Sequence, residues 1–336
     1  MDIAKPYLLF LGDVHDQLAA KTATGVVDWR PEWCVGQLRL EGCKADTGLP
    51  DMSLADAVAK GARTMVVGAA NAGGVLPDHW VAEIVAALEA GLDVATGLHK
   101  RLGSIPAIAE AAARNGRKLH DVRFSDVVLT TGKGTKRPGM RLLTVGTDCS
   151  VGKKYTSLAI DREMHKQGLS SDFRATGQTG VLISGRGLAL DAVVADFISG
   201  AAEWLSPEND PGHWDIIEGQ GSLFHPSFAG VTLGLLHGAQ PDAFVVCHEP
   251  TRTTMRGVKH KLPTIQQVID RTIVEGQLTN PQIACIGIAI NTEHLTEEVA
   301  LAYLKETGEA HGLPCVDPIR TGAEPIVDEL IRRYGR

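Results

Sequence analysis

Aromatic residues are scarce in this chain of 336 residues, of which phenylalanine, tryptophan and tyrosine make up 5%. A platform that stacks nucleic-acid bases is therefore not expected. The net charge is −7 and there is no long basic run, so the chain lacks the concentrated positive face that non-specific nucleic-acid binding requires. No apolar stretch approaches the roughly 20 residues of a membrane-spanning helix, and the first residues carry no cleavable signal pattern. We expect a soluble, cytoplasmic protein that binds neither nucleic acid nor membranes.

The six cysteines are scattered along the chain, and no two of them form a CxxC pair. Neither a disulfide framework nor a zinc site is expected, no bound metal is predicted, and reduced thiols are the simplest interpretation. The length fits about two globular domains, and a hydrophobic content of 44% is ordinary for them. The apolar content and the lack of an obvious disordered tail lead us to expect a homodimer.

The first part of the chain alternates between apolar runs, typical of strands, and amphipathic stretches, typical of helices. Continuous apolar strands between helices indicate a parallel sheet covered on both faces, which is an α/β fold. The expected strands end at Gly12, at the glycine-rich segment 68–74 and at Thr96, and these ends share the sheet edge at which open α/β sheets bind ligands. Strands are expected to begin at 6, 64, 92 and 119, and helices are expected at 54–61, 78–91 and 105–115.

Residues 129–138 are rich in glycine, lysine and threonine and have no apolar periodicity, so we place the domain boundary there. This gives a first domain of 1–136 and a second domain of 137–336, each with a mainly parallel sheet. In the second domain we expect helices at 153–167 and 189–203 and from 265, 297 and 325, and strands at 142–145, 214–217, 243–247, 283–290 and near 316.

The strand-like run at 142–145 leads into a loop bounded by Gly146 and Gly152, and a helix-compatible stretch follows. Glycine lets a backbone approach phosphates, a helix N-terminus favours an anion, and the lysine after the loop adds a charge. The loop has five residues between its glycines instead of the usual four, and Lys154 stands where Ser or Thr usually holds Mg²⁺. The loop is predicted to bind a phosphate-containing ligand; the alternative is a tight glycine turn with an exposed lysine. The predicted binding residues are Gly146, Thr147, Asp148, Cys149, Ser150, Val151, Gly152, Lys153, Lys154, Tyr155 and Thr156.

Glu218 follows a predicted strand and precedes two glycines, with Gln220 and His225 just beyond it. A carboxylate at this strand end would face the ligand of the loop, as a metal ligand or a base; the alternative is a solvated turn residue. Asp196 lies in an apolar stretch where an unpaired charge is costly, so it requires either a ligand or a salt bridge. Cys149 lies near a helix N-terminus, which lowers the pKa of a thiol and makes it reactive, although a small loop-filling residue is the simpler interpretation.

Two arginines are candidate clamps for a substrate carboxylate. Arg174, with Gln178 and Thr179, offers a bidentate guanidinium beside amide and hydroxyl donors, but a lone arginine at a strand start is also a common surface charge. Arg252 lies on a segment that a buried strand delivers to a loop, where binding groups are common. That segment also carries His248, Glu249 and Thr251, and its His–Glu pair is equally compatible with a structural hydrogen bond.

Several unusual strings, spread over nearly the whole chain, resemble the D-glutamate N-acetyltransferases. They are PYLLFLGDVHDQLAAKTATGVVDWRPEWCVGQLRL, ATGLHKRL, GTDCSVGKKYTSLAI, FRATGQTG, VVADFISGAAEWL, IEGQGSLFHPSFAGVTLGLLHG and CHEPTRTTMRG. The resemblance implies a Rossmann-like N-terminal domain and a phosphate-loop C-terminal domain. It also implies an enzyme of D-amino acid catabolism, which moves an acetyl group from acetyl-CoA to the amino group of D-glutamate and gives N-acetyl-D-glutamate.

A second resemblance is local. GTDCSVGK, followed by a Glu-Gly-x-Gly segment, resembles the dethiobiotin-synthetase branch of phosphate-loop proteins and implies an ATP-dependent ligase or kinase. It would assign Lys153 to phosphate, Glu218 to a metal and Arg174 to the position of a substrate-binding lysine. Lys154 counts against this alternative, because Ser or Thr there would favour it. A nucleotide-binding regulator is the third candidate, and the Arg, Glu and His residues around the loop argue against it.

Coenzyme A brings phosphates but no γ-phosphate to transfer, so a loop that lacks the Mg²⁺-binding Ser or Thr fits acetyl transfer. We predict direct transfer to the amine, with Glu218 as the first candidate for the general base and Asp196 as the second. The other predicted roles are clamps for the two substrate carboxylates (Arg174 and Arg252), donors to the tetrahedral oxyanion (Gln220 and His225) and, as a minor alternative, a covalent route through Cys149.

Overall fold

The computed structural model describes residues 3–69, 76–124 and 127–335. Its strands form two separate parallel sheets that are interleaved with helices, so the predicted α/β fold is confirmed. The chain divides into two compact units. Unit 1 contains residues 1–127 and 177–189, and unit 2 contains residues 128–176 and 190–336.

Unit 1 is built around a five-stranded sheet in the order β2-β1-β3-β4-β5, in which every neighbouring pair is parallel. The central strands are buried along their whole length, which explains their continuous apolar sequence. Residues 70–74 of the glycine-rich segment after β3 lie outside the described residues. The strands span Tyr7–Gly12 (β1), Cys34–Arg39 (β2), Thr64–Val67 (β3), Asp93–Thr96 (β4) and Leu119–Asp121 (β5).

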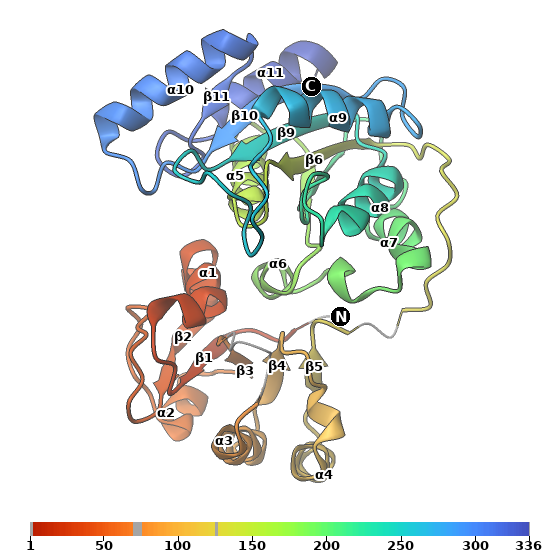
Figure 1. Cartoon of the computed structure of the whole chain (residues 1–336). Coiled ribbons are helices and arrows are strands. Elements are labelled where there is room, and N and C mark those ends of the chain that lie inside the picture. Colours follow the sequence, from red (N-terminus) through yellow and green to blue (C-terminus); the bar gives the residue numbers. More distant parts are fainter. Residues whose placement is uncertain (1–2, 70–75, 125–126, 336) are drawn as a thin grey trace. The chain divides into compact units, whose positions relative to one another are not determined.

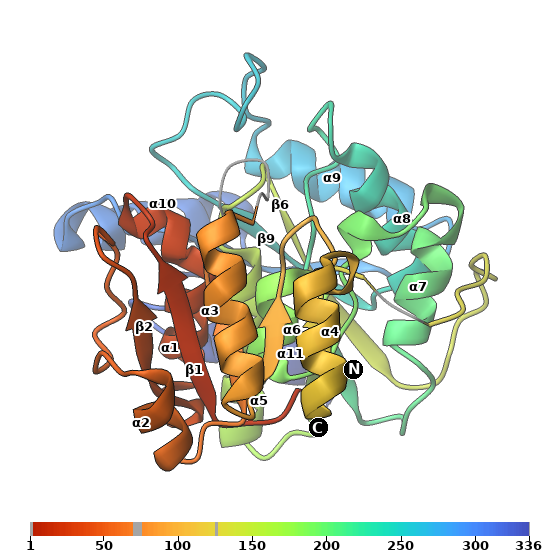
Figure 2. The same ribbon diagram turned by 90° about the horizontal axis from the view of Figure 1, so that it is seen from below.

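Helices cover both faces of this sheet. Figures 1 and 2 show α3 (Asp78–Glu89) and α4 (Pro106–Asn115) on one face, and α1 (Lys21–Trp29) and α6 (Gln178–Ser184) on the other. The short helix α2 (Leu54–Ala59) contacts β2. The positions of α2, α3 and α4 agree with the sequence-based expectation, whereas α1 and β2 are not predicted by it.

Unit 2 contains a six-stranded parallel sheet in the order β11-β10-β9-β6-β8-β7. Strand β6, which leads into the phosphate loop, lies between β8 and β9. The residues that follow β8 and β9 therefore flank the loop at the carboxyl edge of the sheet. The strands span Met140–Gly146 (β6), Ser171–Arg174 (β7), Trp214–Ile217 (β8), Ala243–His248 (β9), Ala284–Ile290 (β10) and Cys315–Val316 (β11).

The helices of unit 2 also form two layers (Figure 1). Helix α5 (Lys153–Lys166) packs with α11 (Glu324–Tyr334) on one face, and α8 (Ala229–Ala239) packs with α9 (Ile265–Gly276) on the other. Helix α7 (Ile198–Leu205) lies against α8, and α10 (Glu297–His311) contacts β11. Among the helices of the described residues, none combines the length and the apolar character that crossing a bilayer requires.

Two helical expectations in unit 2 need correction. The helix expected at 189–203 is interrupted, because 190–192 and 195–197 form short 3₁₀ turns and α7 begins only at Ile198. Helix α8 is not predicted at all, since its three glycines disfavour helix formation. Packing explains it: a Cβ at Gly234 would lie 2.7 Å from the Ile198 side chain, and a Cβ at Gly238 would lie 2.1 Å from the Ser199 carbonyl. The close approach of α7 to α8 requires glycine there.

The two compact units do not coincide with the expected domains of 1–136 and 137–336, and they differ from them in two segments. Residues 128–136 lie with unit 2, where the Lys136 ammonium pairs with Asp242 at 2.7 Å. Residues 177–189 lie with unit 1 because α6 packs on α1, where the hydroxyls of Thr22 and Thr179 are 3.4 Å apart.

Candidate active site

The phosphate loop connects β6 to α5 in the order that the sequence predicts. Ser150 and Gly152 adopt the left-handed conformation, with φ of +54° and +99°. Such turns let successive backbone N–H groups face an anion. The loop also folds tightly on itself, because a Cβ at Gly146 would lie 2.7 Å from the side chain of Val151. The backbone conformation is therefore one that suits phosphate, while the binding role of each loop residue stays a prediction.

The three polar residues after the loop are held in different ways. Lys153 is only 7% exposed, its ammonium donates to the carbonyl of Asp148 at 2.7 Å, and burial lowers its pKa. Lys154 is half-buried, with its ammonium 5.0 Å from the centre of the Tyr155 ring. The buried Thr156 donates its hydroxyl to the carbonyl of Gly152 at 3.1 Å. The Thr156 hydroxyl, two residues beyond the usual Mg²⁺-binding position at Lys154, is thus hydrogen-bonded within the helix.

Asp148 joins the loop to the segment that follows β9. It is fully buried, and its Oδ2 accepts from the guanidinium of Arg252 at 2.8 Å and from the backbone N–H of Arg256 at 2.7 Å. Arg252 also donates to the carbonyl of Cys149 at 2.7 Å and lies 3.5 Å from the Glu249 carboxylate. Arg252 therefore lies at the site as predicted, but its guanidinium fastens the loop, and its role as a substrate clamp stays a prediction.

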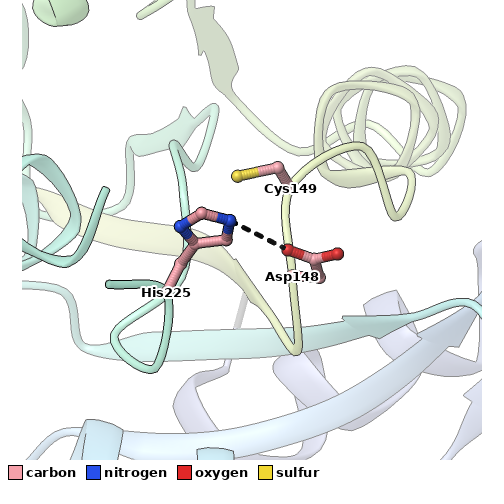
Figure 3. A group of neighbouring side chains, drawn as sticks. All are labelled: Asp148, Cys149 and His225. Carbon is pink, nitrogen blue, oxygen red and sulfur yellow. Dashed lines mark ion pairs between the residues drawn. The ribbon is translucent and has the colours of Figure 1, made fainter. Parts of the chain in front are cut away.

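Asp148, Cys149 and His225 lie together beside the loop, with their potential metal-ligating atoms within 4.8 Å of one another (Figure 3). The buried His225 accepts the backbone N–H of Ser227 on Nδ1 at 3.1 Å, so the ring proton is on Nε2. Nε2 lies 3.0 Å from the carbonyl of Arg256 and 3.9 Å from Oδ1 of Asp148. A metal at Nε2 would break that hydrogen bond and turn a protonated Nδ1 toward the Ser227 N–H. The ring of His225 is thus held by the backbone on both nitrogens, while Oδ1 of Asp148 is buried and has no hydrogen-bond partner among the described residues.

The thiol of Cys149 does not have the activated environment that its position suggests. Burial raises its pKa, and this outweighs the nearby Lys153 ammonium. Both nitrogens of His225 are engaged with the backbone, so the ring has no lone pair with which to take the thiol proton. The expected lowering of the thiol pKa is therefore wrong, and a small loop-filling residue is the interpretation that the structure favours.

Glu218 follows β8 directly and lies beside the loop. It is 5% exposed, and its Oε2 accepts the backbone N–H of Thr176 at 3.0 Å. The chain passes very close to β6 here, because a Cβ at Gly219 would lie 1.7 Å from the carbonyl of Thr144. The Glu218 carboxylate also favours the charged form of Lys153. A buried carboxylate is thus held next to the phosphate loop, where its role as a base stays a prediction.

The amide of Gln220 supports this turn. Its Nε2 donates to the hydroxyl of Thr176 at 2.9 Å, and that hydroxyl donates to the carbonyl of Glu218 at 2.6 Å. His248 and Glu249 bind different partners: Nδ1 of His248 lies 2.9 Å from the hydroxyl of Thr147, and Glu249 accepts the backbone N–H of the nearby Thr251 at 2.8 Å. These polar residues fix the loop and its flanking strand ends.

The structure does not bring Arg174 to the loop. Its Nε donates to Asp215 at 2.7 Å, and Nη2 lies 3.1 Å from Asp172. Asp172 and Asp215 are paired with each other in the sheet, nearer to the amino ends of β7 and β8 than Arg174 is. The guanidinium therefore reaches away from the carboxyl edge that carries the loop. Arg174 is therefore not placed as the expected substrate clamp; its ion pairs link β7 to β8.

Two of the other predicted residues, Gln178 and Thr179, belong to unit 1, and the third, Asp196, belongs to unit 2. Gln178 and Thr179 begin α6 in unit 1, where a Cβ at Gly97 would lie 1.9 Å from Oε1 of Gln178. Asp196 is exposed on a 3₁₀ turn, so the expected cost of a buried, unpaired charge does not arise. The stretch around Asp196 is not a continuous helix, because 190–192 and 195–197 form separate 3₁₀ turns.

Two residues of the site are not found by the sequence analysis. Arg256 lies in the same loop as Arg252. The signal that points to Arg256 is the presence of two arginines in one loop that follows a buried strand and ends in glycine. For Thr176 the sequence holds no comparable signal, because its contact with Glu218 depends on the pairing of β7 with β8.

Unit 2 is therefore a phosphate-loop α/β domain, with a buried carboxylate at the neighbouring strand end. Residues 128–327 match the family described as "Domain of unknown function (DUF1611_C) P-loop domain", and residues 38–125 match "Domain of unknown function (DUF1611_N) Rossmann-like domain". The chain belongs to the DUF1611 family. The Rossmann-like and phosphate-loop domains expected from the sequence are confirmed.

Relatives of the chain match along nearly its whole length. It is 54% identical over 329 residues to a D-glutamate N-acetyltransferase of Tritonibacter scottomollicae, covering 98% of this chain and 99% of the relative. It is 50% identical over 331 residues to a D-glutamate N-acetyltransferase of a Pseudoalteromonas species, covering 98% and 100%. The crystal structure of a DUF1611 family protein from Anabaena variabilis is similar, with 31% identity, a TM-score of 0.87 and coverage of 98% and 100%. The resemblance found in the sequence is confirmed.

Proposed function

We propose that this chain is an N-acetyltransferase that moves the acetyl group of acetyl-CoA to the amino group of D-glutamate. Two relatives named for that reaction share half or more of its residues along nearly the full length. The observation that carries the choice of donor is at residue 154. Lys154 stands at the position of the Mg²⁺-binding hydroxyl, and the hydroxyl of Thr156 donates a hydrogen bond to the carbonyl of Gly152. The loop suits phosphates that are bound but not transferred.

In the proposed reaction, the backbone N–H groups of 146–154 and the ammonium of Lys153 hold the phosphates of the donor. The acceptor arrives as an ammonium ion, and Glu218 takes one of its protons. The free amine then attacks the thioester carbonyl carbon, the C–N bond forms, and the C–S bond breaks. The nitrogen loses its second proton as the C–S bond breaks, and the departing coenzyme A thiolate takes up that proton. The position of Glu218 beside Lys153 and the loop supports this assignment.

The supporting residues have narrower proposed roles. Arg252 ties the loop to the segment after β9. Of the two arginines predicted to clamp the substrate carboxylates, Arg252 lies at the loop and Arg174 does not. His225 and Gln220 keep the flanking turns in place through backbone and hydroxyl contacts. The cytoplasmic location and the homodimer stay predictions from the sequence.

One assay tests the function against its rival. The purified protein is mixed with acetyl-CoA and D-glutamate, and the release of free thiol is followed with and without Mg-ATP. We expect release without ATP, a product of the mass of N-acetylglutamate, and much slower release with L-glutamate. Turnover that requires Mg-ATP would replace this function by the ligase or kinase alternative.

A further inference from the structure

An open cavity of about 510 Å³ lies in the segment after β9, next to the phosphate loop. Arg252, Arg256 and Lys259 supply its charged groups, Met255 and Val258 supply apolar surface, and no carboxylate lines it. The segment folds back on itself, since the backbone N–H of Met255 donates to the carbonyl of His260 at 2.8 Å. The cavity is therefore a shallow, widely open and positively charged surface of one segment of unit 2.

Arg256 is held by two buried side chains at once. Its backbone N–H donates to Oδ2 of Asp148, which is fully buried, and its carbonyl accepts from Nε2 of His225, which is 1% exposed. Its guanidinium is exposed and donates from Nη1 to the hydroxyl of Ser150 on the phosphate loop. Both backbone groups of one arginine are thus fixed by the site's own buried residues. The fixed backbone reduces the main-chain entropy that ligand binding would cost, and the contact to Ser150 restrains the side chain.

The positive charge in the cavity is not neutralised by the chain. Arg252 is compensated by Asp148 and Glu249, with distances of 2.8 and 3.5 Å. Within the described ranges, neither Arg256 nor Lys259 has a carboxylate within 4.0 Å, the limit for an ion pair. Two uncompensated cations beside an anion-binding loop form a favourable site for a second anion. Guanidinium and ammonium groups suit a phosphate dianion in particular.

We propose that this cavity binds the 3′-phosphate of coenzyme A, a phosphomonoester, while the phosphate loop binds the pyrophosphate. The inference rests on the proposed function, because it assumes that the donor is acetyl-CoA. It adds a residue-level source of donor specificity: Arg256 and Lys259 distinguish coenzyme A from the same molecule without its 3′-phosphate. Asp148 and His225 are positioning residues in this scheme, since they hold the backbone of Arg256.

Calorimetric titration tests the proposal without requiring turnover. Coenzyme A and 3′-dephospho-coenzyme A are titrated into the wild type, Arg256→Gln and Lys259→Gln. We expect the wild type to bind coenzyme A about ten- to a hundredfold more tightly, because the dephospho compound lacks the charge-assisted contacts to the 3′-phosphate. Each variant should lose most of that preference and keep its affinity for the dephospho compound. Arg271→Gln and Lys305→Gln, at exposed helical ion pairs elsewhere in unit 2, serve as matched controls and should behave like the wild type.

The outcomes separate this proposal from the proposed function. A wild type that binds both compounds equally, or a variant that loses affinity for both by the same factor, would overturn the 3′-phosphate site. Discrimination between the two compounds, together with no acetylation of D-glutamate, would support the site and overturn the function instead. The Arg256→Gln variant keeps the backbone groups that Asp148 and His225 hold, so an unchanged melting temperature confirms that only the side chain is tested.

Discussion

The ammonium of Lys153 donates a hydrogen bond to the backbone carbonyl of Asp148, at 2.7 Å, within the phosphate loop itself. The lysine is buried, and this burial lowers its pKa. The buried ammonium therefore donates to a neutral carbonyl oxygen. Burial disfavours the charged form of this lysine, and the negative charge of an anionic ligand would stabilise that form.

Replacement of Lys153 by methionine keeps an unbranched side chain and removes the charge. We expect the dissociation constant for coenzyme A to rise about ten- to a hundredfold, because a hydrogen bond to a charged group is worth about 1.5–3 kcal/mol. Titration calorimetry measures the change. Lys166→Met, at the exposed end of α5 where the lysine pairs with Glu163 at 3.2 Å, is the control and should bind as the wild type does. Equal affinities in the two variants would contradict the role of Lys153.

Replacement of Glu218 by glutamine tests the base. The amide oxygen can still accept the backbone N–H of Thr176, so the turn should keep its shape. We expect kcat to fall by about 10²- to 10⁴-fold, the usual value of general-base assistance, while coenzyme A affinity changes less than about twofold. Steady-state kinetics and calorimetry give the two numbers, and the exposed Glu208→Gln is the matched control. Unchanged turnover in Glu218→Gln would remove this residue from the mechanism.

The parts of the site whose positions follow from the sequence rest on local patterns. The phosphate loop is readable because strand, glycine-bounded loop and helix are consecutive in the sequence. The position of Glu218 beside the loop is readable because the residue directly follows a strand, and that strand, β8, is the neighbour of β6. Arg252 is placed at the loop for the same reason, since it follows β9 on the other side.

The parts that were missed depend on pairing between distant segments. Arg174 looks like a free clamp until the register of β7 and β8 places Asp215 beside it. The glycine-rich α8 looks like a loop until α7 packs against Gly234 and Gly238. The segment 177–189 crosses to unit 1 although its sequence lies between strands of unit 2. No local pattern carries these facts, because each depends on a partner far away in the chain.

Replacement of Cys149 by serine tests the covalent alternative. The thiol has a pKa raised by burial, and His225 has no free nitrogen to accept its proton, so a thioester at this position is not expected. The variant should keep most of its turnover. Mass spectrometry of the wild type, quenched after mixing with acetyl-CoA alone, should show the unmodified protein. An acetyl adduct on the Cys149 peptide, together with an inactive serine variant, would establish the covalent route.

Replacement of His248 by asparagine should change how stability depends on pH. Burial lowers the pKa of His248 below its ordinary 6.5, against the charge of Glu249, which raises it. Between the lowered pKa and 6.5 the unfolded state binds more protons, so the free energy of unfolding rises with pH there and is fully regained above 6.5. Urea denaturation at about pH 7.5 and at about pH 5 measures the free energy of unfolding at both values. The decrease from the higher to the lower pH should be larger for the wild type than for the variant. The exposed His294→Asn is the control and should lose as much as the wild type; equal losses in wild type and His248→Asn would contradict the assignment.

Replacement of Gly219 by alanine tests how tightly Glu218 is held. The new Cβ would lie 1.7 Å from the carbonyl of Thr144, a backbone atom that cannot move without displacing β6. Overpacking of this kind costs about 1–3 kcal/mol and sometimes more, so we expect a loss of about 3 kcal/mol in urea denaturation. Turnover should fall as well, because the strain displaces the residue before it. Gly230→Ala, in α8 with no atom within 4 Å of the new Cβ, should be neutral or stabilising by up to about 1 kcal/mol. Equal stability of the two variants would show that the chain at Gly219 has more room than this geometry allows.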